Sequence, residues 1–147
     1  MSEPYSLKNY TPCESIGFLL KRAGNQLAIT VDRKLAPFDM THAQLGIFLK
    51  LLHGHAKTAA DLARELMTDT GAMTRMLDRL EEKGFIQRTR SSADRRVVEV
   101  GLTAKGQQLA DQMIQAVVDT LNHHLRGFTE AEVDQFKDFL RRMIANA

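Results

Sequence analysis

Apolar residues recur along most of this chain at the three- and four-residue spacing of amphipathic helices. The first stripe predicts a helix from Ile16 to Leu35, because Pro37 disfavours helical geometry in the residue before it. Capping residues and glycine stops then predict five further helices, at 41–53, 58–66, 69–83, 103–126 and from 129 onward. The predicted fold class is therefore mainly α.

A two-residue alternation occupies the segment between the fourth and fifth predicted helices. Residues 85–90 are typical of one strand, and Val98, Val100 and Leu102 give a second strand one apolar face. The strands are expected to pair as a small β-hairpin with residues 91–95 at its tip. Two short helices joined by a tight turn and followed directly by such a hairpin predict a winged helix-turn-helix.

The long helices at both ends of the chain carry apolar stripes that a compact winged helix-turn-helix cannot cover. We expect them to pair with the same helices of a second copy. The predicted organisation is a helical dimerisation region made of residues 1–36 and 103–147. Residues 37–102 are expected to form the winged helix-turn-helix DNA-binding domain.

Length and composition fit one ordinary globular domain: 147 residues, 44% hydrophobic and 26% charged. No apolar run is long enough to span a membrane, and the start lacks the pattern of a signal peptide. The single cysteine, Cys13, excludes an internal disulfide framework. Together these features favour a cytoplasmic protein with no membrane partner. Cys13 is interpreted as an incidental thiol, with a redox sensor as the alternative.

The positive charge is concentrated in one segment. The whole chain carries a formal net charge of +2. Residues 70–96 alone hold seven basic side chains and four acidic ones, which gives that segment +3. A basic stripe on a nearly neutral protein is expected where one face meets phosphate groups.

Several motifs occur in the order and at the spacing of a known family. They are residues 62–66 (LAREL), 71–75 (GAMTR) and 80–86 (LEEKGFI), followed by D-x-R at 94–96 and L-T at 102–103. From about Ile16 to Ile144 the chain resembles the MarR (multiple antibiotic resistance regulator) family. The resemblance implies a homodimeric transcriptional regulator, usually a repressor, that binds a palindromic operator on double-stranded DNA. It also implies that a small-molecule effector often releases the operator.

The helix at about 70–83 is the expected recognition helix for the major groove. One face is apolar and must point to the core, through Met73, Met76, Leu77 and Leu80. The opposite face near its start presents the candidate DNA-binding residues Thr70, Gly71, Thr74 and Arg75. Small residues allow close approach to the groove, and arginine reaches base edges or phosphate. The alternative is an ordinary amphipathic helix, which the basic hairpin that follows disfavours.

The hairpin, or wing, at about 88–98 is expected to enter the minor groove. We expect Asp94 to brace one neighbouring arginine while the other enters the groove, where arginine suits a narrow A·T minor groove. The resemblance implies that Arg96 is the arginine of the D-x-R motif. Either Arg95 or Arg96 could enter the minor groove, and we slightly favour Arg95. Arg88 and Arg90 alternate onto one side of their strand and are expected to contact phosphates. The alternative is a solvated turn with a weak surface ion pair.

The resemblance places an effector pocket between the first two helices and the long fifth helix. His42, Phe48 and His53 are candidates by position, although Phe48 suits an ordinary core residue equally well. The five histidines raise a metal hypothesis, but no cysteine or carboxylate cluster accompanies them, so no metal site is expected. Met67 and Thr68 depart from the family pattern, because many members have glycine and an aliphatic residue at these positions.

No catalytic motif occurs in the sequence, so neither enzymatic activity nor a cofactor is expected. Two other classes remain as alternatives to a DNA-binding regulator. One is a winged-helix module that binds only other proteins, and the other is a small-molecule binding protein with no role on DNA. Neither alternative explains the basic segment, and both predict no salt-dependent binding to duplex DNA.

Overall fold

The structure of the chain, a computed structural model, describes residues 3–54 and 56–147. Its helices are α1 (Ile16–Leu35), α2 (His42–Leu52), α3 (Ala59–Glu65), α4 (Thr70–Glu82), α5 (Ala104–His124) and α6 (Glu130–Ala145). Two short 3-10 helices, η1 (Pro12–Glu14) and η2 (Ala36–Phe38), flank α1. Strands β1 (Ile86–Arg90) and β2 (Val98–Leu102) form the hairpin between α4 and α5. The predicted fold class and order of elements are confirmed.

Local capping signals set most helix starts. Thr41 and Thr129 each form the predicted capping box, with Gln44 and Glu132 respectively. Strand β1 begins one residue later than predicted. Phe85 is still tied to α4, because its amide donates to the Leu80 carbonyl at 3.0 Å, and the Val97 amide is taken by the Asp94 carbonyl at 2.9 Å.

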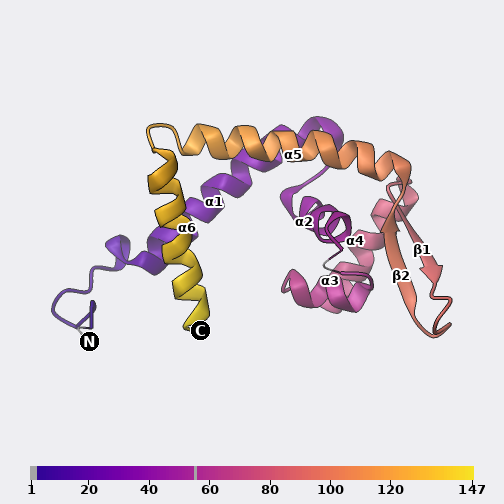
Figure 1. Ribbon diagram of the computed structural model, residues 1–147, viewed down its shortest axis with the longest axis horizontal. Coiled ribbons are helices and arrows are strands. Elements are labelled where there is room, and N and C mark those ends of the chain that lie inside the picture. The colour runs from indigo at the N-terminus through magenta and orange to yellow at the C-terminus, as the bar shows by residue number, and fades with distance from the viewer. Residues whose placement is uncertain (1–2, 55) are drawn as a thin grey trace.

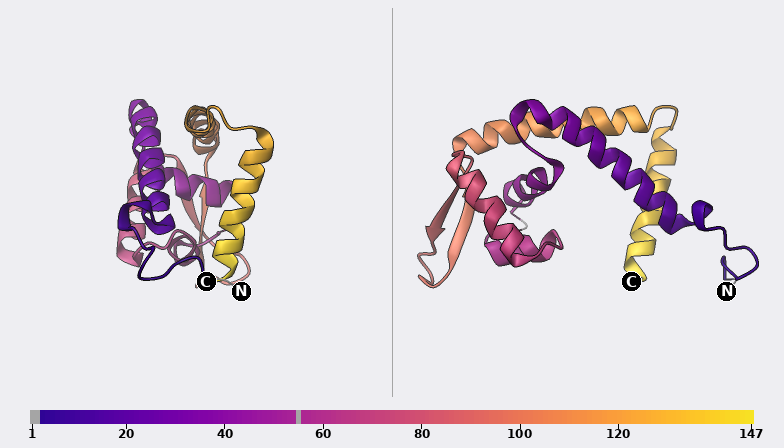
Figure 2. Two further views of the ribbon diagram at one scale, coloured as in Figure 1. Left: turned by 90° about the vertical axis from the view of Figure 1, so that its left-hand side faces the viewer. Right: turned by 180° about the vertical axis from the view of Figure 1, so that it is seen from behind.

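The elements are arranged along α5, which runs from the hairpin to α6 (Figure 1). Helix α1 packs against α5. A lobe of α2, α3, α4 and the hairpin lies at the N-terminal end of α5, and α6 descends from its other end (Figures 1 and 2). The lobe that is expected to bind DNA and the expected dimerisation helix α6 therefore stand at opposite ends of one long helix.

The hydrophobic core lies inside the lobe and extends to α1 and α5. Its fully buried side chains include Leu35, Ile47, Phe48, Leu62, Met73, Leu77, Leu80, Ile86 and Met113. They come from α1, α2, α3, α4, β1 and α5, so every element of the lobe contributes to one cluster. This shared core fixes how the hairpin and α4 lie relative to α5.

Helix α6 contributes nothing to that core. None of its described residues is buried. Large apolar side chains of this helix are exposed in the single chain, with Phe136 at 43%, Phe139 at 51% and Ile144 at 72% relative exposure. Over the described part of the chain, no helix is long and apolar enough to cross a membrane.

Candidate nucleic-acid interface

The four residues expected in the major groove are all exposed at the start of α4: Thr70, Gly71, Thr74 and Arg75. The opposite face of the helix is held in the core by Met73, Leu77 and Leu80. Asp69 caps the helix by accepting the Ala72 amide at 3.0 Å, as its sequence position predicts. Burial of one face therefore turns the polar start of α4 outward.

Gly71 leaves space beside the Arg75 side chain. A Cβ placed on Gly71 would lie 3.5 Å from Nη1 of Arg75 and 3.2 Å from Oδ2 of Asp69. The Arg75 guanidinium thus lies over the first turn of α4, where free amide groups and the helix dipole also carry positive potential. This combination attracts a phosphate or a base-edge acceptor.

The turn before α4 holds a strained residue, Met67. Its φ of 49° lies in the left-handed region, which residues other than glycine rarely adopt. The amide of Thr68 donates to the Ala63 carbonyl at 2.9 Å and the amide of Met67 to the Arg64 carbonyl at 3.3 Å. These two bonds form a Schellman motif that ends α3. The family preference for glycine at this position is thereby explained, and the turn forms despite the departure.

The hairpin is anchored to the segment before α3 through β2. Its register pairs Arg88 with Val100 and Arg90 with Val98. On its other edge, the Val100 amide donates to the Lys57 carbonyl at 2.7 Å, just before α3. The wing therefore has a fixed position relative to α3 and cannot swing as an independent arm.

Asp94 braces Arg96. Oδ1 of Asp94 accepts from the backbone amide and from Nε of Arg96, both at 3.1 Å, and Oδ2 accepts from Nη2 at 3.2 Å. The side chain of Arg96 and its backbone amide together hold the pKa of the Asp94 carboxyl below its usual value. At neutral pH the brace is therefore fully ionised.

Arg95 has a different environment. Its carbonyl accepts from Nη1 of Arg90 at 2.9 Å, which fixes the backbone of the wing tip. Within the described chain, the Arg95 guanidinium makes no hydrogen bond or ion pair. Of the two adjacent arginines, Arg96 is the one held by the acid and Arg95 is the one with its guanidinium unengaged.

Arg88 does not lie free for a phosphate contact, which differs from the sequence expectation. Its Nη2 donates to Oδ1 of Asp78 at 2.6 Å, and its Nε lies 3.8 Å from Oε2 of Glu81. Both carboxylates belong to α4. Arg88 points to α4 because the inward-facing side of β1, which begins with buried Ile86, is covered by that helix.

Sequence reasoning missed the contact that joins α5 to the turn after α4. The Thr103 hydroxyl donates to the Gly84 carbonyl at 2.7 Å, and Lys105 Nζ donates to the Lys83 carbonyl at 3.0 Å. A Cβ on Gly106 would lie only 2.1 Å from the Phe85 carbonyl oxygen. The L-T pair followed three residues later by glycine was the available signal for this close packing.

The structure does not gather His42, Phe48 and His53 around one cavity. The His42 ring contacts Asp32 on α1, with Nδ1 2.9 Å from Oδ1 of that carboxylate. Phe48 is fully buried and stacks edge-on against Phe85 at 6.1 Å between ring centroids. His53 is exposed, and its Nδ1 lies 2.9 Å from the Leu49 carbonyl oxygen. Their assignment to a ligand pocket stays a prediction.

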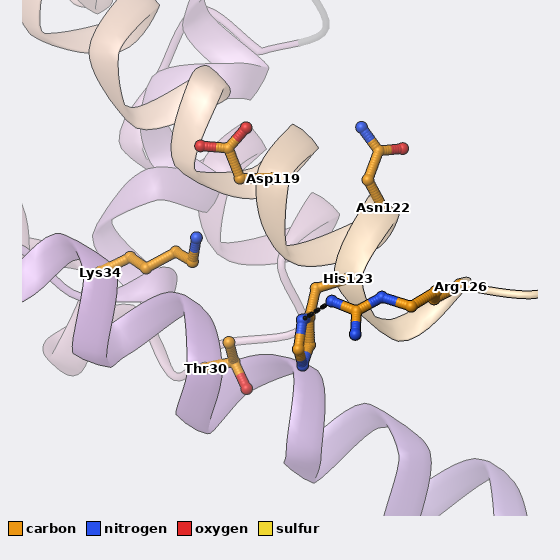
Figure 3. A pocket seen from close by; sticks show the side chains of 6 residues that line it. All are labelled: Thr30, Lys34, Asp119, Asn122, His123 and Arg126. Carbon is orange, nitrogen blue, oxygen red and sulfur yellow. Dashed lines mark hydrogen bonds between the residues drawn. The ribbon is translucent and has the colours of Figure 1, made fainter.

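A groove of about 460 Å³ does lie between α1 and α5 (Figure 3). It is lined by Thr30, Lys34, Asp119, Asn122, His123 and Arg126. Figure 3 shows Arg126 bonded to His123, with Nη2 3.0 Å from Nδ1. In the described residues, Lys34 makes no hydrogen bond or ion pair with a neighbour. The groove therefore offers hydrogen-bonding groups from α1 and α5, with one cation from α1 and one from the turn after α5.

Metal-ligating side chains are not clustered. Across residues 3–54 and 56–147, no three His, Cys, Asp or Glu side chains are arranged as a metal site. His124 bonds instead to Thr30, with Nε2 3.1 Å from the hydroxyl. His55, which the metal hypothesis also considers, lies outside the described residues. Cys13 is exposed beside α1.

Comparison with known proteins identifies the family. Residues 40–98 match the MarR family. The chain is 31% identical over 130 residues to the multiple antibiotic resistance protein MarR of Escherichia coli strain K12, covering 88% of this chain and 90% of that protein. It is 37% identical over 114 residues to YwhA of Bacillus subtilis strain 168, named an uncharacterised HTH-type transcriptional regulator, covering 77% and 81% of the two chains.

Solved structures extend the similarity to the fold. Wild-type apo MarR from E. coli gives a TM-score of 0.77 at 30% identity, covering 88% of this chain and 96% of that chain. A mutant of the same protein complexed with operator DNA gives 0.79 at 29% identity, covering 95% and 99%. With its winged helix-turn-helix lobe and this similarity over most of its length, the chain belongs to the MarR family of DNA-binding transcriptional regulators.

Proposed function

We propose that this regulator is a homodimeric repressor of a palindromic operator, with α4 in the major groove and the wing in the adjacent minor groove. The observation that carries the proposal is the wing tip, where Asp94 holds Arg96 and leaves the Arg95 guanidinium unengaged. An unengaged arginine beside a recognition helix is what a minor-groove contact requires. The E. coli relative has been solved in complex with operator DNA, which supports operator binding by this chain.

Palindromic recognition follows from two-fold symmetry. A dimer formed through α1, α5 and α6 would present two copies of α4 about 34 Å apart, one turn of B-DNA. Thr70, Thr74 and Arg75 would then read base edges in each half-site. Arg90, which is exposed near the wing, is assigned a phosphate contact in this arrangement.

The roles of the wing arginines are tested on an operator selected from a random duplex library. We expect Arg95→Ala to weaken binding and to lower the slope of log affinity against log salt by about one unit, because one DNA contact is lost. Arg96→Ala should also weaken binding, because the brace that shapes the wing is removed. Arg75→Ala should weaken binding through the major groove.

Lys8→Ala is the control for this experiment. Lys8 is exposed and belongs to the N-terminal arm, which Figure 1 draws at the end of the molecule away from the hairpin. Its substitution removes the same single charge. Equal affinity of the folded Arg95→Ala/Arg96→Ala double variant and the wild type would rule out the wing assignment. If the wild type shows no salt-dependent binding to any duplex, the proposed function is wrong. The protein would then be a protein-interaction module or a small-molecule binding protein.

Release by a small molecule is the second part of the proposal, and the groove between α1 and α5 is the site assigned to it. The supporting observation is its lining, which includes Lys34 from α1 and Asn122 from α5. A ligand that contacts both helices binds one relative placement of them better than another. It would therefore shift the spacing of the two DNA-binding lobes by its differential affinity.

This site is tested by screening small organic acids, amines and neutral phenols for release of a labelled operator duplex. A compound that acts through the groove should release the wild type and lose potency against Lys34→Met. Lys21→Met is the control, because Lys21 is exposed on the same helix but does not line this groove. Equal potency against Lys34→Met and the wild type would place the effector site elsewhere.

A further inference from the structure

Arg88 connects the two elements that are proposed to contact DNA. It extends from β1 of the hairpin and contacts two carboxylates of α4, Asp78 at 2.6 Å and Glu81 at 3.8 Å. The two acids are three residues apart, so they lie on neighbouring turns of the same helix face. One guanidinium thus spans the space between the wing hairpin and the recognition helix.

The guanidinium is anchored between these elements and does not extend into solvent. The Arg88 side chain is only 28% exposed to solvent. Its Nε is buried and has no hydrogen-bond partner among the described residues. The acids are more open, at 53% for Asp78 and 44% for Glu81. Ion pairs at such partly exposed positions add little to global stability, so their main effect is on geometry.

The position of the acids makes this geometry important for DNA. Asp78 lies four residues after Thr74, and Glu81 three residues after Asp78, so both continue the exposed stripe that begins with the proposed base-reading residues. Two unpaired carboxylates on that stripe would repel phosphates. The single positive charge of Arg88 offsets one of these two negative charges, and the same side chain joins both acids to the hairpin.

We infer that Arg88 is a positioning residue that fixes the angle between the wing and α4, so that both enter adjacent grooves together. The inference rests on the proposed DNA contacts of α4 and the wing. It assigns Arg88 no contact with DNA. A phosphate contact and a positioning role therefore make different predictions about salt, because only a group that neutralises a phosphate contributes to counterion release.

The decisive variant removes an acid from the recognition helix. If charge alone mattered, Asp78→Ala would tighten operator binding, because a negative charge near DNA is lost. If Asp78 instead holds Arg88 in place, the same change should weaken binding by about tenfold. Glu82→Ala is the matched control, because Glu82 is exposed at the end of α4 and has no ion pair among the described residues. It should leave binding unchanged or tighten it.

Arg88→Met supplies the second readout, since methionine keeps an unbranched apolar side chain without the guanidinium. We expect about tenfold weaker binding with the salt slope unchanged, and the Arg88→Met/Asp78→Ala double variant should be no weaker than Arg88→Met alone. Circular dichroism melting curves confirm that each variant is folded at the assay temperature. A salt slope lower by about one unit would show a phosphate contact and overturn the inference.

The outcomes separate this inference from the proposed function. Binding by Asp78→Ala that matches or exceeds that of the wild type overturns the positioning role while leaving the regulator intact. Absence of salt-dependent binding by the wild type overturns the proposed function, and with it the role of Arg88. Weaker binding by Asp78→Ala together with unchanged or tighter binding by Glu82→Ala supports the inference.

Discussion

Met67 is the residue at which local backbone strain and solvent exposure coincide. Its φ is 49° and its relative exposure is 89%, so its side chain contributes almost no packing to offset the left-handed conformation. The Schellman bonds of Thr68 and Met67 nevertheless keep it there. The turn between α3 and α4 is thus held by its hydrogen bonds against the preference of the residue it contains.

Replacing this residue should therefore stabilise the protein. We expect Met67→Gly to raise the free energy of unfolding by about 0.5–1 kcal/mol, because relief of left-handed strain exceeds the added entropy of the unfolded chain. Chemical denaturation followed by circular dichroism measures the change. Gly84→Ala is the opposite control: its φ is 80° and the nearest atom to a new Cβ is 4.0 Å away, so only strain is added. A destabilised Met67→Gly variant would contradict this account.

The arginines show how far sequence predicts a site residue by residue. The motif and its spacing correctly located the hairpin and predicted that Asp94 holds a neighbouring arginine, but only the structure shows that this arginine is Arg96. Alternation along β1 correctly placed Arg88 and Arg90 on one side of the strand. It did not predict which element covers that side. Helix α4 covers the part near Arg88 and not the part near Arg90, which depends on how the helix and hairpin pack.

At the scale of elements, helix starts were predictable because capping signals are local. Asp69, Thr41 and Thr129 cap the helices that their positions indicate. The role of Gly106 was not predictable, because the atom it must accommodate belongs to Phe85, 21 positions earlier in the chain. Close contacts between distant segments depend on tertiary packing, which periodicity does not encode.

This close contact gives a prediction for the start of α5. Gly106→Ala should lower the free energy of unfolding by about 3 kcal/mol, because the new Cβ overlaps a backbone oxygen that is held in place by Thr103. Thermal and urea denaturation measure the loss. Gly101→Ala on β2 is the matched control, with no atom within 4 Å of its new Cβ, and should change stability by at most about 0.5 kcal/mol. Equal effects of the two substitutions would argue against tight packing at Gly106.

At the scale of the whole molecule, the exposed face of α6 is the strongest indication that this chain does not act alone. A helix of 16 residues with no buried side chain lacks the tertiary packing that normally maintains helices in water. The division into a DNA-binding region and a helical dimerisation region stays a prediction. It would account for the apolar surface that the single chain leaves uncovered.

We expect Phe139→Glu to shift the protein from dimer to monomer, because a charge would be buried in the interface that α6 is proposed to form. Sedimentation velocity over a range of concentrations measures the change. The loss of packing should also lower the helical signal in circular dichroism. Gln135→Glu adds the same charge at an exposed polar position of the same helix and should leave assembly intact. A wild type that sediments as a monomer would contradict the proposed dimer.

The start of α5 is mechanically coupled to the turn after α4 by the contacts of Thr103, Lys105 and Gly106. The 21 residues of α5 extend about 30 Å at 1.5 Å per residue. Because the backbone at Gly106 fits against Phe85 without space to slide, a tilt of α5 is transmitted to the C-terminal end of α4. A tilt of about 5° at one end displaces the other by about 2.6 Å over that length. Such a displacement is enough to take a hydrogen bond out of range, so a small change among the far helices would decide whether α4 fits the groove that is proposed for it.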